Sequence, residues 1–175
     1  MAEALYNYLN RPEIYVGTYG KYNAGKLTGD WVQLDQYETE EKFYDACAEL
    51  HSDEHDPEFM FQDFQGIPDG YIGESHIHPS VWEWLKREPW EREVIEAYAA
   101  GVGPHEDVET ILEASCGWFD TWQDYVDQYI DDTGLLDSIP EDLRGYFDAE
   151  HFGRDLESAY SVVDYNRKTF VFYQF

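Results

Sequence analysis

The sequence predicts an α+β protein with three parts. These are a β-β-α-β unit at the N-terminal end, a helical middle and a C-terminal α+β unit with a hairpin. Strand-like alternation of apolar residues occurs near both ends, and helical spacing occurs between them. The chain of 175 residues also carries 6 Trp, 15 Tyr and 10 Phe. Each buried aromatic side chain removes about 150–250 Å² from water, so the chain can form a core despite its high charge.

Two predicted strands and a loop open the chain. Residues 13–19 have strand-like composition, and a loop rich in Gly and Asn follows over residues 20–29. The alternating apolar pattern of residues 30–35 predicts a second strand. Thr39 then precedes two glutamates, which is typical of a helix N-cap followed by acids in the first turn.

This helix and a third strand complete the N-terminal unit. The helix is expected to end at about Leu50, with Phe43, Cys47 and Leu50 on one face. Residues 51–56 are a polar, acidic break, and the apolar residues of 59–64 predict the third strand.

Helical spacing dominates the middle of the chain. Pro79 suits a first helical position, and apolar residues at helical spacing continue to Tyr98. A stretch with Gly and Pro at residues 101–104 stops this pattern. A further helix is expected over residues 105–115. Its acidic face consists of Glu106, Glu109 and Glu113.

The helix expected to begin near Asp120 carries a stripe of acids. At 100° per residue, its four acids fall within a stripe about 60° wide. They are Asp120, Asp124, Asp127 and Asp131. Like charges at this spacing repel by a few tenths of a kcal/mol, and no lysine lies between them. An ordinary solvated face is the simpler interpretation. The acids of the helix at 105–115 favour an interaction surface instead, as do those of an earlier loop, Asp53, Glu54, Asp56 and Glu58.

Mixed structure returns at the C-terminal end. Residues 139–144 predict a short helical turn, and Asp148 is a candidate cap for a helix that ends near residue 157. Two strand-like segments, 160–165 and 169–175, predict a hairpin.

The net charge of −27 is concentrated in one region. Residues 43–143 contain 26 acids and three bases, whereas residues 144–175 contain five acids and four bases. Two copies of the chain could therefore meet at the C-terminal end without opposing like charges, and Tyr160 and Phe172 are candidates for that dimer contact. The charge excludes binding to nucleic acid or to an anionic membrane surface, because both require basic residues.

Motifs for catalysis or for cofactor binding are absent from the sequence. There is no phosphate-binding glycine loop and no EF-hand loop. Four histidines in two pairs could bind a metal, although exposed histidines without a ligand are the favoured interpretation; they are His51, His55, His76 and His78. We therefore expect no enzyme activity, no cofactor and no metal. Two separated cysteines and no apolar segment that could span a membrane favour a cytoplasmic protein.

Several segments of the sequence resemble the ArdA antirestriction proteins. The resemblance begins at residues 12–23 (PEIYVGTYGKYN) and covers both ends of the chain, whereas between about residues 75 and 130 it lies in the acidity more than in particular residues. Its other segments are 43–47, 50–54, 56–64, 134–136, 139–144, Tyr146 and 152–156, of which the last four look like the antirestriction motif of that family. Residues 1–11 look like an extension.

The resemblance implies a homodimeric DNA mimic encoded on mobile elements. Family members are elongated, consist of three small domains, and dimerise through the C-terminal one. Here the domains would be 1–66, 67–104 and 105–175. Carboxylates on the surface would replace phosphates, so that the protein occupies the DNA-binding groove of a type I restriction-modification enzyme and blocks restriction, modification or both. A dimer would carry twice −27, or −54, the charge of about 27 base pairs.

Three other hypotheses remain open from the residues alone. The protein could inhibit another basic DNA-binding protein. It could be a housekeeping protein adapted to high salt, although such proteins spread their acids evenly. It could also be a cation-binding protein, which a specific stability gain with Ca²⁺ or Zn²⁺ would reveal.

Overall fold

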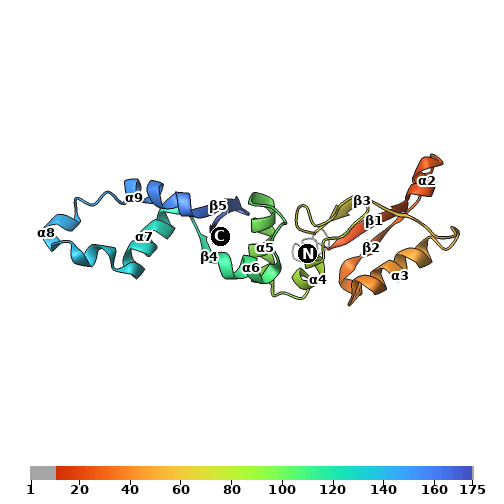
Figure 1. Cartoon of the computed structure of the whole chain (residues 1–175), viewed down its shortest axis with the longest axis horizontal. Coiled ribbons are helices and arrows are strands. Elements are labelled where there is room, and N and C mark those ends of the chain that lie inside the picture. Colours follow the sequence, from red (N-terminus) through yellow and green to blue (C-terminus); the bar gives the residue numbers. More distant parts are fainter. Residues whose placement is uncertain (1–10, 175) are drawn as a thin grey trace, which may run out of the picture. The chain divides into compact units, whose positions relative to one another are not determined.

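The computed structural model of the chain describes residues 11–174 and confirms a mixed α+β fold. The chain divides into two compact units, one ending at Arg92 and the other beginning at Glu93, each built around a three-stranded antiparallel sheet (Figure 1). We name these units 1 and 2. The finer division into 1–66, 67–104 and 105–175 stays a prediction.

Unit 1 contains the expected β-β-α-β arrangement. Its sheet has the order β2-β1-β3, and its strands are β1 (Glu13–Thr18), β2 (Asp30–Gln33) and β3 (Phe59–Gln65). Helix α3 (Glu40–Leu50) begins as expected, since the Thr39 side chain accepts a hydrogen bond from the amide of Lys42. Phe43 and Cys47 of this helix are fully buried, and the Phe43 ring lies 6.3 Å from that of Phe61 on β3. These contacts form the core on one face of the sheet.

Three details of unit 1 differ from the expected pattern. Part of the predicted loop is helix α2 (Tyr19–Asn23), because the Thr18 side chain caps the amide of Lys21. The second strand ends early, since residues Leu34–Gln36 form a 3₁₀ turn. Leu50 is the last residue of α3 and is 38% exposed, so it is not buried as Phe43 and Cys47 are.

The rest of unit 1 is a loop region followed by helices. Helix α4 (Ser80–Trp84) follows Pro79, and its Trp82 ring lies 5.9 Å from Phe43. Helix α5 (Pro89–Gly101) contains the boundary between the two units.

Unit 2 has a strand that the sequence pattern did not predict. Strand β4 (Ser115–Phe119) pairs with β6 (Lys168–Tyr173), which also pairs with β5 (Tyr160–Tyr165), so the sheet order is β4-β6-β5. The helix expected over 105–115 is α6 (Val108–Ala114) and ends where β4 begins. Gly117 has a φ of 101°, which favours glycine, and this backbone gives β4 its irregular register with β6.

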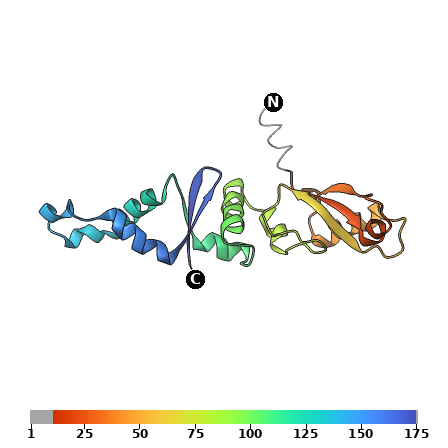
Figure 2. The ribbon, with the colours of Figure 1, turned by 90° about the horizontal axis from the view of Figure 1, so that it is seen from above.

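Helices lie against the sheet of unit 2. The Tyr98 ring of α5 lies 5.0 Å from Phe172, and the two views place α5 beside the hairpin of β5 and β6 (Figure 2). Tyr125 of helix α7 (Trp122–Thr133) packs with Tyr160 and Val171 in a second cluster. The remaining elements are a 3₁₀ turn at Leu135–Ser138, α8 (Glu141–Arg144), α9 (Ala149–Leu156) and a 3₁₀ turn at Glu157–Ala159.

The C-terminal predictions agree closely with the structure. Asp148 caps α9 by accepting a hydrogen bond from the amide of His151. The hairpin turns through Asn166 and Arg167, which have φ values of 49° and 65°, as a tight two-residue turn between strands requires. Over residues 11–174, no helix is both long and apolar enough to cross a membrane.

Candidate acidic interaction surface

Helix α7 presents an acidic face and buries the opposite one. Asp124, Asp127 and Asp131 are exposed, whereas Tyr125 and Val126 belong to the core. The three acids occupy positions i, i+3 and i+7, so they line one side of the helix over about 10 Å. The packing of the opposite face fixes where these carboxylates stand.

Asp120 lies ahead of this helix, so the expected stripe of four acids contains three helical members. The helix begins at Trp122 because Thr121 is its N-cap. The Thr121 hydroxyl donates to Asp124 at 2.6 Å and accepts from the Asp124 amide at 3.2 Å. Asp127 accepts a hydrogen bond from Gln123 at 2.8 Å. These local bonds restrict the positions of the Asp124 and Asp127 carboxylates.

The acids around α6 do not form the single helical face that was expected. Glu106 precedes the helix, whereas Glu109 and Glu113 belong to it and are exposed. The cap is Asp107, which was not singled out from the sequence. It accepts hydrogen bonds from the backbone amide and the hydroxyl of Thr110. The bond to that amide is the main reason why the pKa of Asp107 is lowered.

A buried histidine, His51, anchors the acidic loop of unit 1. His51 is 1% exposed, so interpreting it as an exposed histidine is wrong. Its Nε2 lies 3.1 Å from the carbonyl oxygen of Val16, and its Nδ1 lies 2.9 Å from the Lys21 ammonium nitrogen. Because the carbonyl can only accept and the ammonium can only donate, the ring is the neutral tautomer with its proton on Nε2.

Lys21 ties two of the loop acids to this histidine. Its ammonium nitrogen lies 2.8 Å from Asp53 and 3.4 Å from Glu54. The hydrogen bond from Lys21 is the main cause of the lowered pKa of Asp53, and the same bond raises the pKa of Lys21. Glu54 also accepts from the Thr18 hydroxyl at 2.7 Å, so it points inward. Asp56 and Glu58 are exposed.

One group of side chains in this loop has the spacing of a metal site. Potential ligand atoms of His51, Asp53 and Glu54 lie within 4.8 Å of one another. The Lys21 ammonium already lies at hydrogen-bond distance from His51 and Asp53. It therefore supplies the positive charge that a metal ion would bring to these ligands. The arrangement is therefore that of an internal ion pair.

The two residues predicted for the dimer contact lie inside unit 2. Tyr160 is 4% exposed and Phe172 is fully buried. Exposed apolar side chains lie on the same sheet. Tyr173 follows Phe172 on β6 and is 57% exposed, and Trp118 on β4 pairs with Phe170 of β6 and is 52% exposed. A role for Tyr160 and Phe172 in self-association stays a prediction, and any such role would act through the position of these exposed neighbours.

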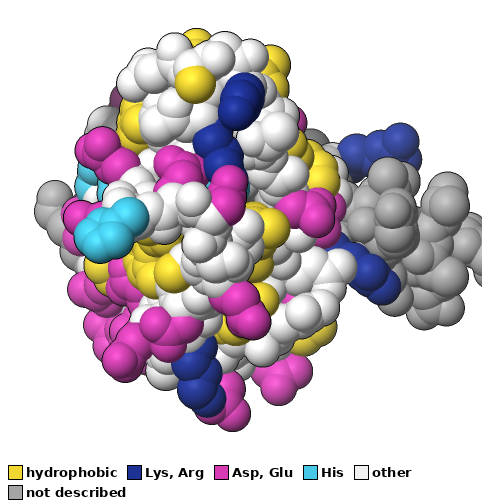
Figure 3. Space-filling view, turned by 90° about the vertical axis from the view of Figure 1, so that its right-hand side faces the viewer, with side chains coloured by type: hydrophobic (Ala, Val, Ile, Leu, Met, Phe, Trp, Pro, Cys, Tyr) yellow, Lys and Arg dark blue, Asp and Glu magenta, His cyan; other side chains and the backbone are white. Residues whose placement is uncertain are grey.

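The charge of each unit is strongly negative. Residues 11–92 contain 18 acids and seven bases, and residues 93–175 contain 19 acids and four bases. Figure 3 looks onto the end of unit 1 that carries α2 and α3, where carboxylates are spread over the visible surface with several Lys and Arg side chains among them. The fold and the charge define an acidic α+β protein.

The family follows from the comparison with known sequences. Residues 14–170 match the sequence model of the family described as Antirestriction protein (ArdA), so the chain belongs to the ArdA antirestriction family. This family is of the inhibitor type, its function is antirestriction, and its partner is a restriction-modification enzyme. The resemblance noted in the sequence is thereby confirmed. No curated protein matches the chain.

Proposed function

We propose that this protein is a DNA mimic that binds the DNA-binding groove of type I restriction-modification enzymes and blocks restriction, modification or both. The observation that carries the proposal is the charge of unit 2. Between Glu93 and Leu143 there are 14 carboxylates and no Lys or Arg. Such a segment repels itself, and a basic groove that accommodates DNA would relieve that repulsion.

The mechanism is competition for the groove. Lys and Arg side chains that neutralise DNA phosphates would pair with the carboxylates of this protein instead, so that protein and DNA exclude each other. Long-range attraction makes association fast and dependent on ionic strength. The aromatic core under α7 keeps the acids in place before binding, which reduces the entropy lost on association.

The acids proposed for this surface are those predicted from the sequence. Exposed single contacts are each worth under about 1 kcal/mol, so no single acid should be essential. Asp120, Asp124, Asp127, Asp131, Glu106, Glu109 and Glu113 are the members in unit 2, and Asp53, Glu54, Asp56 and Glu58 are those in unit 1. The inward bonds of Glu54 make its contribution the smallest of the loop.

A competition assay tests the proposal. A purified type I restriction enzyme is mixed with fluorescent duplex DNA, and this protein is added at several salt concentrations. We expect near-stoichiometric displacement of DNA that weakens as salt rises. DNA that stays bound at low salt with the protein in large excess would exclude this class of enzyme as the target.

The competition assay and two stability measurements separate the alternative functions. Displacement of DNA from an unrelated basic DNA-binding protein with equal efficiency would favour a general inhibitor. A protein adapted to high salt would unfold in dilute buffer, which a thermal melt without added salt detects. A cation-binding protein would gain stability from Ca²⁺ or Zn²⁺ beyond the effect of the same ionic strength of NaCl.

A further inference from the structure

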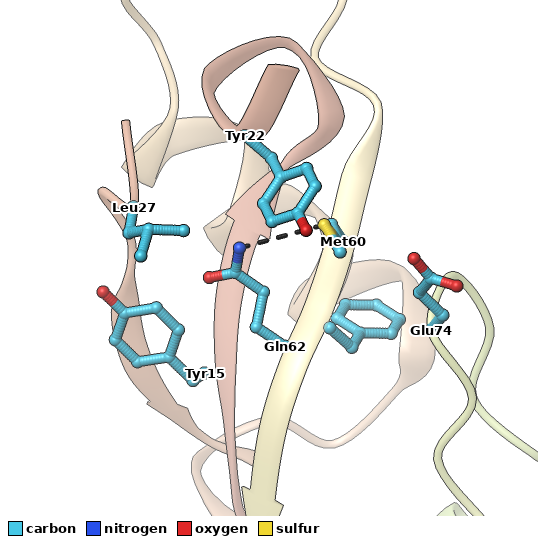
Figure 4. Close-up of a pocket in the computed structure, with 7 residues that line it drawn as sticks. Tyr15, Tyr22, Leu27, Met60, Gln62 and Glu74 are labelled. Atoms are coloured by element: carbon cyan, nitrogen blue, oxygen red, sulfur yellow. Dashed lines mark hydrogen bonds between the residues drawn. The ribbon is translucent and has the colours of Figure 1, made fainter. Parts of the chain in front are cut away.

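Unit 1 has an apolar groove on one face of its sheet, lined in part by aromatic side chains. The groove has a volume of about 600 Å³ and is lined by Tyr15, Tyr22, Leu27, Met60, Phe61, Gln62 and Glu74. Figure 4 shows Tyr15 and Leu27 on one side of Gln62, with Met60 and Glu74 on the other. Tyr22 and Leu27 are 48% and 70% exposed, so their apolar surface is open to a partner.

The groove results from a missing side chain and a bulge in the sheet. Tyr15 pairs with Asp63 and Val16 pairs with Phe61, so Gln62 is the extra residue of a β-bulge. Gly17 lies beneath it, and a Cβ atom on Gly17 would approach Gln62 Oε1 to 3.0 Å. The absence of a side chain at Gly17 therefore leaves room for Gln62 to lie across β1 as the floor of the groove.

The walls of the groove are held in place before any partner binds. The Tyr15 hydroxyl donates to the Gly29 carbonyl oxygen at 3.1 Å, and the Tyr15 ring stacks edge-on with Trp31 at 5.6 Å. Gln62 Nε2 lies 3.8 Å from the Met60 sulfur. A partner would therefore lose little affinity to the ordering of Tyr15, Met60 or Gln62.

One end of the groove is negatively charged. Glu74 is exposed, and its carbonyl oxygen accepts a hydrogen bond from the Phe61 amide at 2.7 Å, which anchors Glu74 beside β3. The pKa of the neighbouring Tyr19 is raised by burial and then by the Glu74 carboxylate, with a smaller contribution from Glu58. The groove thus combines aromatic and apolar walls with a carboxylate at its end.

We propose that this groove binds an arginine side chain of the basic partner protein. A planar guanidinium stacks on tyrosine rings and forms forked hydrogen bonds with a carboxylate, which the compact ammonium of lysine does not do. The aliphatic part of the arginine would lie against Leu27 and Met60. The proposal rests on the proposed function, because the DNA-binding groove of the restriction enzyme would supply the arginine. This contact would be additional to those that the enzyme makes with DNA.

A peptide titration tests the groove without any restriction enzyme. The chain has 2 methionines, Met1 and Met60, so ¹³C-methyl labelling of methionine gives one signal from the groove. The probes are capped Gly-Arg-Gly and the same peptide with lysine or citrulline in place of arginine. We expect the arginine peptide to shift the Met60 signal at concentrations on the order of millimolar, and the other two peptides to shift it much less. An unchanged Met60 signal, or equal shifts with arginine and lysine, would overturn the proposal.

Variants in the DNA competition assay test the groove in the full complex. We expect Tyr22→Ala combined with Leu27→Ala to raise the half-inhibitory concentration about tenfold, corresponding to about 1.4 kcal/mol. Its salt dependence should stay unchanged, because these side chains release no counterions. Leu50→Ala is the control, since Leu50 is 38% exposed and does not line this groove.

The outcomes distinguish the groove from the mimic surface. Wild-type inhibition by a double variant that remains folded would overturn the groove proposal and leave the proposed function intact. Failure of the wild-type protein to inhibit, together with arginine-selective shifts at Met60, would refute the proposed target and support the groove.

Discussion

Lys21 is the basic side chain around which the acidic loop of unit 1 closes. It lies between a buried histidine and the carboxylates of Asp53 and Glu54, and its side chain is only 16% exposed. The remaining acids of the loop face solvent. Lys21 therefore holds Asp53 and Glu54 in place, and the Asp53 side chain, which is 67% exposed, stays accessible to a partner beside Asp56 and Glu58.

The Lys21 ion pair leads to a prediction about pH. The pKa of Asp53 is lowered, so its stabilising effect is complete above its unfolded value of about 3.9 and is lost as pH falls through the folded value. The pKa of Lys21 is raised, so its effect is complete below about 10.4 and is lost as pH rises through the folded value. We expect Lys21→Met to lower the melting temperature of unit 1 between about pH 5 and pH 9.

Thermal unfolding across pH, with Lys26→Met as the control, measures this effect. Lys26 is an exposed lysine of the same unit. The difference between Lys21→Met and wild type should shrink at both pH extremes. A difference that is constant from pH 3 to pH 11 would show that Lys21 acts through packing of its methylene groups alone.

At the scale of the element, α7 depends on its cap. The Thr121 side chain satisfies the amide of Asp124, and loss of an N-cap costs about 1 kcal/mol. We expect Thr121→Ala to lower the free energy of unfolding of α7 by that amount, as measured by native-state hydrogen exchange of its amides. Thr121→Ser keeps the hydroxyl and should restore most of the loss; equal destabilisation by both variants would contradict a capping role.

The acidic face of α7 should serve binding more than stability. Replacing Asp120, Asp124, Asp127 and Asp131 together with Asn removes repulsion of a few tenths of a kcal/mol from each of the helical pairs Asp124–Asp127 and Asp127–Asp131. It also removes the acid Asp124 from the first turn, where a negative charge is favourable, so the variant should melt close to the wild-type temperature. Its inhibition of a type I enzyme should nevertheless weaken about tenfold.

Four acids outside the proposed surface provide the matched control for α7. Asp35, Asp45, Asp63 and Asp69 are exposed residues of unit 1, and their change to Asn removes the same charge. Equal loss of inhibition in the two variants would mean that total charge, and not the position of the acids on α7, determines binding.

At the scale of the whole molecule, both units carry a large negative charge, and self-association must avoid opposing these charges. Residues 144–175 have five acids and four bases, so their net charge is small. We therefore propose the C-terminal end as the dimer interface. Tyr160 and Phe172 are buried, so substitutions there should affect folding, whereas substitutions of exposed residues on the same sheet should affect association alone. An exposed neighbour can therefore be changed without opening the core.

Two substitutions on β6 make this separation measurable. We expect Tyr173→Ser to shift the protein from dimer towards monomer in analytical ultracentrifugation while its circular dichroism stays unchanged, because Tyr173 is 57% exposed. Phe172→Asp should unfold unit 2, since loss of a buried phenylalanine alone costs about 3–5 kcal/mol and a buried charge adds to that cost. A dimer of unchanged strength in Tyr173→Ser would remove this residue from the interface.

Local sequence patterns correctly predicted the elements whose caps and turn residues lie within a few residues of the element itself. Thr39 and Asp148 cap their helices as expected, and the hairpin turns at Asn166 and Arg167. Strand β4 was missed because Ser115–Phe119 is short and continues a helical pattern, and only its pairing with β6 makes it a strand. Helix α2 was missed because its cap, Thr18, belongs to the preceding strand.

The sequence by itself determined the family, the α+β class and the distribution of charge, because these depend on composition and on local order along the chain. Only the tertiary structure decided which acids face solvent and which are paired. Lys21 and Asp53 are 32 residues apart, and Gly17 lies beneath Gln62 through strand pairing. Such neighbours are fixed by the packing of the sheet and its helices, which bring together residues that no local pattern connects.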